Sequence, residues 1–164
     1  MDVYATLLAS ERDQLNARLD GHRAGLRASL DSLTEEEARR GLVPSTTTLL
    51  GLLARVTYAE VVWSEEAVEG LPREQAGLRG SAAEAFTLDP DATIETVLTA
   101  HAAAIAVSRD ILNARQLDQV VTGHALGPMT VRWILLHLIS EMAQHHGHAD
   151  ILREQILASR GQTT

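Results

Sequence analysis

Histidines and one glutamate recur near the C-terminal end of the chain at spacings that suit a metal site. The segment 137–148 contains His137, Glu141, His145, His146 and His148. Side chains four residues apart lie on one face of an α-helix, so Glu141 and His145 would point the same way. Carboxylate and imidazole groups are ligands for zinc, and imidazole also suits nickel. The segment predicts part of a metal site and leaves open which residues complete it.

A helical wheel separates these side chains into two groups. At about 100° per residue, one arc of roughly 80° holds four polar residues: His137, Glu141, His145 and His148. Apolar residues of the same segment share this arc, which predicts that it faces the protein interior. His146 lies on the opposite side and is expected to face solvent. A single inward histidine such as His137 is often only a core residue with one hydrogen bond, whereas an inward Glu141 needs a partner or a metal.

Four segments with helical periodicity must position this face. We expect helices over about 4–32, 45–70, 91–115 and 130–159, separated by glycine, proline and polar residues. Thr34 with Glu37 predicts a capped short helix, Asp91 is a plausible cap for the third long helix, and Thr130 for the fourth. No strand-like alternation is present. The expected fold is all-α: one four-helix bundle over 1–164, with short extra helices in the connections. The long connection 71–90 permits a crossover between helices.

Composition argues against several classes of function. The formal net charge of −8 disfavours nucleic acid as a partner. The chain has no cysteine, which rules out a disulfide framework, a thiolate metal site or a cysteine nucleophile within it. No segment approaches the roughly 20 apolar residues of a membrane span. We therefore expect a cytoplasmic protein without a nucleic-acid or membrane partner.

Three segments resemble the DinB-like superfamily of four-helix bundles, and within it the actinobacterial-type branch related to mycothiol-dependent enzymes. They are LDGHRAGLRASLDSLTEEEARR, VPSTTTLLGLLARV leading to VVW, and TVRWILLHLISEMAQHHGHADILRE. The resemblance implies three ligands for a metal, usually zinc or nickel. A glutamate and a histidine four apart on the last long helix match Glu141 and His145. The third ligand, a histidine shortly after LLGL, corresponds to Arg55 in this chain.

Arg55 departs from the pattern because a guanidinium stays protonated and has no lone pair to donate to a metal. His148, or His137, could substitute as a ligand, but both come from the same helix as Glu141. Alternatively, Arg55 points inward and forms an ion pair with Glu141, which would neutralise the carboxylate and bridge two helices. A third alternative is that Arg55 extends along the surface into solvent. The apolar neighbours on its helical face favour the inward orientation.

We expect a small-molecule-binding bundle with a degenerate metal site. The expected pocket residues are Arg55, Tyr58, His137 and His148, and any zinc or nickel would be weakly bound or absent. The alternative is a metal-dependent enzyme, a thiol-using transferase or isomerase (or a hydrolase), with Glu141, His145 and His148 as ligands. The partner is then a low-molecular-weight thiol from outside the chain. Whether the protein is catalytic stays open at this point.

The second long helix is apolar on nearly all sides. It is expected either to contribute to a homodimer, which the resemblance also implies, or to lie at the centre of the bundle.

Overall fold

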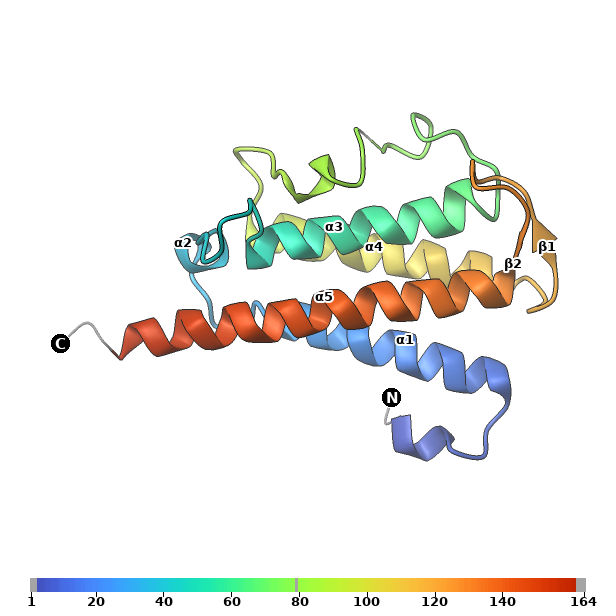
Figure 1. Cartoon of the computed structure of the whole chain (residues 1–164), viewed down its shortest axis with the longest axis horizontal. Helices are drawn as coiled ribbons and strands as arrows, with labels where there is room; N and C mark the ends of the chain where they lie inside the picture. Colours follow the sequence, from blue (N-terminus) through green and yellow to red (C-terminus); the bar gives the residue numbers. More distant parts are fainter. Residues whose placement is uncertain (1–2, 79, 162–164) are drawn as a thin grey trace.

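Four long helices lie side by side around one apolar core (Figure 1). The computed structural model describes residues 3–78 and 80–161, so both ends of the expected 1–164 domain lie outside the described residues. The long helices are α1 (Glu11–Ala28), α3 (Leu49–Val61), α4 (Ile94–Asn113) and α5 (Val131–Arg160). The predicted all-α four-helix bundle is confirmed.

The long helices do not simply alternate in direction. In Figure 1, α3 and α4 run one way while α1 and α5 run the other. The side-chain contacts agree, since Arg132 near the start of α5 bonds Glu11 at the start of α1, and Arg153 near the end of α5 bonds the carbonyl of Ser29. The segment 67–93 must therefore return along the length of α3 before α4 begins. The expected long connection is a crossover that passes over α3 (Figure 1).

Each long helix begins after a serine or threonine whose hydroxyl accepts a hydrogen bond from the backbone amide three residues on. These caps are Ser10, Thr48, Thr93 and Thr130. Only the cap at Thr130 matches the prediction. The sequence predicts earlier starts for the first three helices: apolar residues continue upstream of Ser10, and the other two predicted starts lie directly after Pro44 and Pro90. Asp91 is the wrong cap by two residues.

Short elements fill the connections. Thr34 and Glu37 form the predicted reciprocal capping box at α2 (Glu35–Ala38). Single turns of helix occur at η1 (Val3–Thr6) and η3 (Glu84–Phe86), and a π-helical turn, η2 (Val62–Glu66), continues α3. Two strands, β1 (Val120–Val121) and β2 (Met129–Thr130), pair antiparallel between α4 and α5. At two residues each, they are too short to give the alternation that predicts a strand.

Helix α3 lies at the centre of the bundle rather than on a free face. Its apolar side chains pack within the chain, and Leu49, Leu50, Leu52, Leu53 and Val56 are all buried. Its apolar character is thereby explained without a second copy of the protein, and a homodimer stays a prediction. Among the described helices, none combines the length and the apolar character needed to cross a membrane.

Candidate functional site

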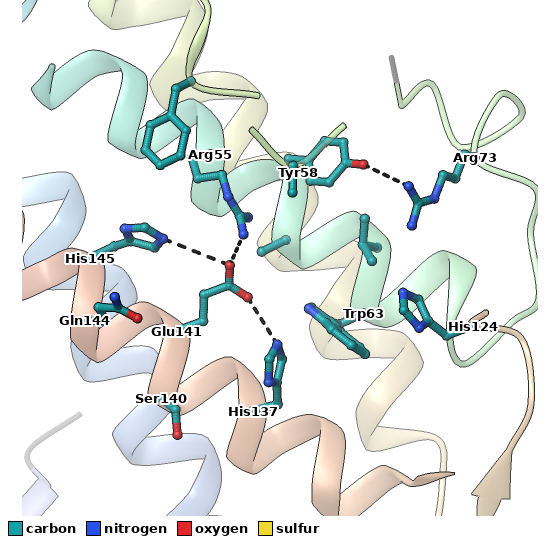
Figure 2. Close-up of a pocket in the computed structure, with 14 residues that line it drawn as sticks. Arg55, Tyr58, Trp63, Arg73, His124, His137, Ser140, Glu141, Gln144 and His145 are labelled. Atoms are coloured by element: carbon teal, nitrogen blue, oxygen red, sulfur yellow. Dashed lines mark hydrogen bonds and ion pairs between the residues drawn. The ribbon is translucent and has the colours of Figure 1, made fainter. Parts of the chain in front are cut away.

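A cavity of about 540 Å³ opens between α3, α5 and two connections that cover them (Figure 2). These are the crossover connection between α3 and α4 and the hairpin loop between β1 and β2. Its wall contains four kinds of group: guanidinium, carboxylate, imidazole and aromatic ring. The residues that line it and carry these groups are Arg55, Tyr58, Trp63, Arg73, Phe86, His124, His137, Glu141 and His145. A cavity of this size suits a small molecule rather than a macromolecule.

The floor of the cavity is built around Glu141 (Figure 2). An ion pair joins Nη2 of Arg55 to Oε1 of Glu141, as predicted from the sequence. The two side chains are only 16% and 11% exposed, so little water competes for either charge. The other carboxylate oxygen lies 3.4 Å from Nε2 of His137, and Nε2 of His145 lies 4.0 Å from Oε1. Glu141 is thus surrounded by one fixed cation and two imidazoles.

The crossover connection can close over this floor because Gly51 has no side chain. A Cβ at Gly51 would lie 2.8 Å from the backbone oxygen of Phe86, too close for any other residue without a shift of the backbone. The close approach brings the Phe86 ring against the edge of His145, with ring centroids 5.9 Å apart. One edge of the pocket therefore depends on a small residue in the first turn of α3.

Two tryptophans hold His137 in place. Its ring stacks on Trp133 at 5.0 Å and meets Trp63 edge-on at 4.3 Å. Trp63 belongs to the π-helical turn η2, and it also contacts His124, whose ring stacks on it at 4.7 Å. The hairpin loop supplies His124, so this side of the pocket wall is assembled from η2, the hairpin loop and α5.

A second arginine lies on the crossover connection at the edge of the pocket. Nε of Arg73 donates to Oε2 of Glu66 over 2.7 Å, and its Nη1 donates to the hydroxyl of Tyr58 over 3.3 Å. That hydroxyl in turn donates to the carbonyl of Gly80 at 3.3 Å. Arg73 is thus tied both to the end of η2 and, through Tyr58, to the connection.

Two of the sequence predictions for α5 are wrong. His148 is exposed and does not line this cavity, whereas His146 is half-buried against α1. His146 packs over Gly25, where a Cβ would lie 2.1 Å from its ring, and its Nδ1 lies 3.3 Å from Nδ1 of His22. The single-arc prediction failed because α5 packs against both α1 and α3 and so has two covered sides.

The donors around Glu141 do not fit a zinc or nickel ion. Arg55 occupies a carboxylate oxygen and brings a positive charge to the place where a third ligand is required. In residues 3–78 and 80–161, no group of three or more histidine, aspartate or glutamate side chains is arranged to hold a metal. His145 is buried, and within that same part of the chain its Nδ1 has no hydrogen-bond partner. Burial, followed by the charge of Arg55, lowers the pKa of His145 and favours its neutral form.

Of the predicted site residues, the structure brings together Arg55, Tyr58, His137, Glu141 and His145, and leaves out His148. The sequence prediction missed Trp63, Arg73, Phe86 and His124 as pocket residues. Arg73, Phe86 and His124 lie in connections, where no periodic pattern indicates which way a side chain points. Trp63 follows an apolar helix, and its type alone did not distinguish a core position from a pocket wall.

Two solved structures share this fold. A conserved protein from Enterococcus faecalis superposes with a TM-score of 0.64 at 19% identity, covering 91% of this chain and 98% of its own. A DinB-like protein from Bacillus cereus superposes with a TM-score of 0.62 at 16% identity, covering 87% of this chain and 91% of its own. At these identities the likeness is one of fold. Comparison with curated proteins gives no significant match.

The match at the level of family is more specific. The family model for Mycothiol-S-transferase matches residues 14–158, a span that reaches into all four long helices and includes every residue of the pocket described above. The chain therefore belongs to the Mycothiol-S-transferase family, and it has the DinB-like four-helix-bundle fold.

Proposed function

We propose that the pocket binds a small molecule without a metal ion, and that the Arg55–Glu141 pair takes the place of the metal. The ion pair is the observation that carries this proposal. A guanidinium supplies a fixed positive charge at the floor of the cavity and neutralises the largely enclosed carboxylate of Glu141. It also bridges α3 and α5, as a metal with ligands on both helices would.

The family description favours a low-molecular-weight thiol among the ligands. The chain contains no cysteine, so any thiol must come from outside. A cation beside a thiol stabilises the thiolate and lowers the thiol's pKa. In the protein, Arg55 provides such a cation in the cavity wall, where Glu141 is the carboxylate that it contacts. Within the described residues, no second carboxylate contacts Arg55. Thiolate stabilisation by Arg55 would give the family's thiol chemistry a route that needs no Lewis acid.

A metal-dependent transferase, isomerase or hydrolase is the second candidate. Its support is the pair Glu141 and His145, one helical turn apart, together with the Nδ1 of buried His145, which is unpartnered within the described residues. For a metal to bind, Arg55 would have to leave Glu141, and a third donor would have to come from elsewhere. His148 is exposed and lies outside this cavity, so it does not supply that donor in the observed conformation.

A thiol titration in the absence of metal tests the proposal. The protein is first dialysed against EDTA, and N-acetylcysteamine serves as an uncharged thiol probe. We expect binding by calorimetry, and a pKa of the bound thiol, followed by thiolate absorbance, at least about one unit below its free value. Arg55→Gln should abolish the pKa change. Arg115→Gln, which removes an arginine paired with Glu69 outside the pocket, should leave it intact.

The two candidates give different results in this experiment. If the metal-free protein does not bind the probe and added zinc restores binding, the metal-dependent candidate is correct. If the probe binds equally to wild type and to Arg55→Gln with no change in thiol pKa, Arg55 has no role in thiol chemistry.

A further inference from the structure

Aromatic residues are scarce in this chain, yet they gather at one cavity. The whole sequence has two tryptophans, two tyrosines and one phenylalanine. Tyr58, Trp63 and Phe86 line the cavity, and Trp133 stacks behind His137, which lines it too. Tyr58 and Trp63 also belong to the apolar core, which is otherwise built mainly from leucine, valine and alanine. Flat faces that surround a cavity favour a flat ligand, since stacked rings attract one another beyond the burial of apolar area.

The cavity wall also contains an arginine, Arg73, whose N–H groups are only partly used in hydrogen bonds to the protein. Arg73 donates from Nε to Glu66 and from Nη1 to Tyr58, and among the described residues Nη2 has no partner. Glu66 is buried, so its carboxylate holds Arg73 firmly, while the Arg73 side chain is 44% exposed. The guanidinium is thereby held through Nε, while its Nη1 and Nη2 end keeps N–H groups that no described residue accepts. That end matches a carboxylate, which accepts two parallel N–H bonds.

Arg55 is less suited to this role. Its side chain is 16% exposed against 44% for Arg73, and Glu141 already contacts its guanidinium, so it has less room to bind both oxygens of a carboxylate. The two arginines therefore suit different tasks: Arg55 compensates a charge at the cavity floor, and Arg73 presents a partly free guanidinium near the entrance. Figure 2 shows the two on different elements, with Tyr58 between them.

We propose that the pocket selects a flat aromatic or conjugated molecule that carries a carboxylate, and that Arg73 binds the carboxylate while the rings of Trp63 and Phe86 contact the flat body. This inference names a ligand class for the small-molecule pocket and so rests on the function proposed above. Arg73 acts as a specificity-determining residue. The ligand class follows from the cavity wall alone, and it does not depend on whether the molecule is the thiol or the thiol's acceptor.

A matched pair of probes tests the inference on the metal-free protein. 2-Naphthoate and 2-naphthamide share the flat ring system and differ in charge, and calorimetry measures the dissociation constant of each. We expect wild type to bind the acid at least about tenfold more tightly than the amide, as suits a charge-assisted hydrogen bond. Arg73→Gln should remove this preference by weakening only the acid. Arg115→Gln, the exterior arginine control, should keep it.

Loss of Arg73 leaves the buried carboxylate of Glu66 without its partner, which can impair folding of the single variant. The double variant Arg73→Gln/Glu66→Gln removes both charges and provides the same comparison. Equal binding of acid and amide by wild type, or a preference that survives in these variants, would overturn the inference. If neither naphthalene compound binds, the ligand class is wrong, while the N-acetylcysteamine titration still decides separately whether the pocket binds a thiol.

Discussion

The guanidinium of Arg55 on α3 contacts the carboxylate of Glu141 on α5, in the interior and between two imidazoles. One residue of this pair stands where the family resemblance implies a metal-binding histidine, and the other matches a metal ligand. Compared with the metal and histidine that the resemblance implies, Arg55 likewise places a positive charge beside Glu141 and links two helices. It changes the chemistry available, because a guanidinium donates hydrogen bonds and has no lone pair for a metal.

The hairpin loop should be sensitive to a single methyl group at Gly123. A Cβ there would lie 2.1 Å from the backbone oxygen of Glu66 and 2.9 Å from that of Ala67, and neither backbone atom can move easily. We expect Gly123→Ala to lower the free energy of unfolding by about 1–3 kcal/mol, the usual cost of overpacking. Urea denaturation measures this change.

Gly147 supplies the matched control for Gly123. It lies in the middle of α5 and is exposed, and a methyl group added there would meet no atom within 4 Å. Gly147→Ala should raise the free energy of unfolding by roughly 0.5–1 kcal/mol, because alanine loses less backbone entropy in a helix. If Gly123→Ala raises the free energy of unfolding as Gly147→Ala does, or leaves it unchanged, the loop is not held against the end of η2 as described.

Helix register and charge pairing explain what the sequence could predict of the site. An inward Glu141 needs a partner, and Arg55 is the cation that the family resemblance places opposite it, so the ion pair was accessible from the sequence. The positions of the Arg73 and His124 side chains could not be predicted from the sequence. In a connection, contacts with residues far away along the chain decide where a side chain lies. Gly51 and Gly123 illustrate this: each permits a close backbone approach that no local pattern reveals.

His146 shows a different limit. A helical wheel assumes one covered face, whereas α5 is covered by α1 as well as α3. The signal for the second covered side lies in another helix, at Gly25, whose missing side chain makes room for the imidazole. Similarly, His101 on α4 could not be placed from the sequence, and the structure buries it completely.

His101 should make the protein less stable in mild acid. Burial, with the nearby charges of Arg27 and Arg23, lowers the pKa of His101 to about 3. An unfolded histidine has a pKa of about 6.5, so between these values the unfolded state binds the extra proton. The contribution of His101 to the free energy of unfolding is therefore fully present above about pH 6.5 and is lost as the pH drops toward 3. From pH 7 to pH 5 this group alone should cost about 2 kcal/mol.

Urea unfolding at pH 7 and pH 5 measures the effect of His101. In His101→Gln the difference between the two pH values should shrink by about 2 kcal/mol. His148→Gln, at an exposed position, should leave the difference nearly unchanged. A wild-type pH dependence retained in His101→Gln would show that other groups cause it.

A second arginine–glutamate pair lies deep in the bundle and should respond differently to single and double substitution. Nε and Nη2 of Arg23 donate to the two carboxylate oxygens of Glu60 over 2.7 and 2.6 Å, and both residues are buried. Arg23→Met leaves an uncompensated buried carboxylate and should cost roughly 3–5 kcal/mol. The double variant Arg23→Met/Glu60→Leu should recover most of this stability. Chemical denaturation of the three proteins provides the comparison, and a double variant as unstable as the single one would refute it.

Zinc-dependent stability of an Arg55 series tests most directly whether this arginine replaces a metal. Arg55→His restores the third ligand that the family resemblance implies, and Arg55→Gln removes the charge without adding a ligand. A metal that binds only the folded state raises stability by mass action, by about 2.7 kcal/mol at one hundred times its dissociation constant. Thermal melts of the three proteins are recorded with EDTA and with zinc. We predict that zinc raises the melting temperature of Arg55→His by several degrees and leaves wild type and Arg55→Gln unchanged. Equal stabilisation of wild type and Arg55→His by zinc would contradict the account, because Arg55 would then not have displaced the metal.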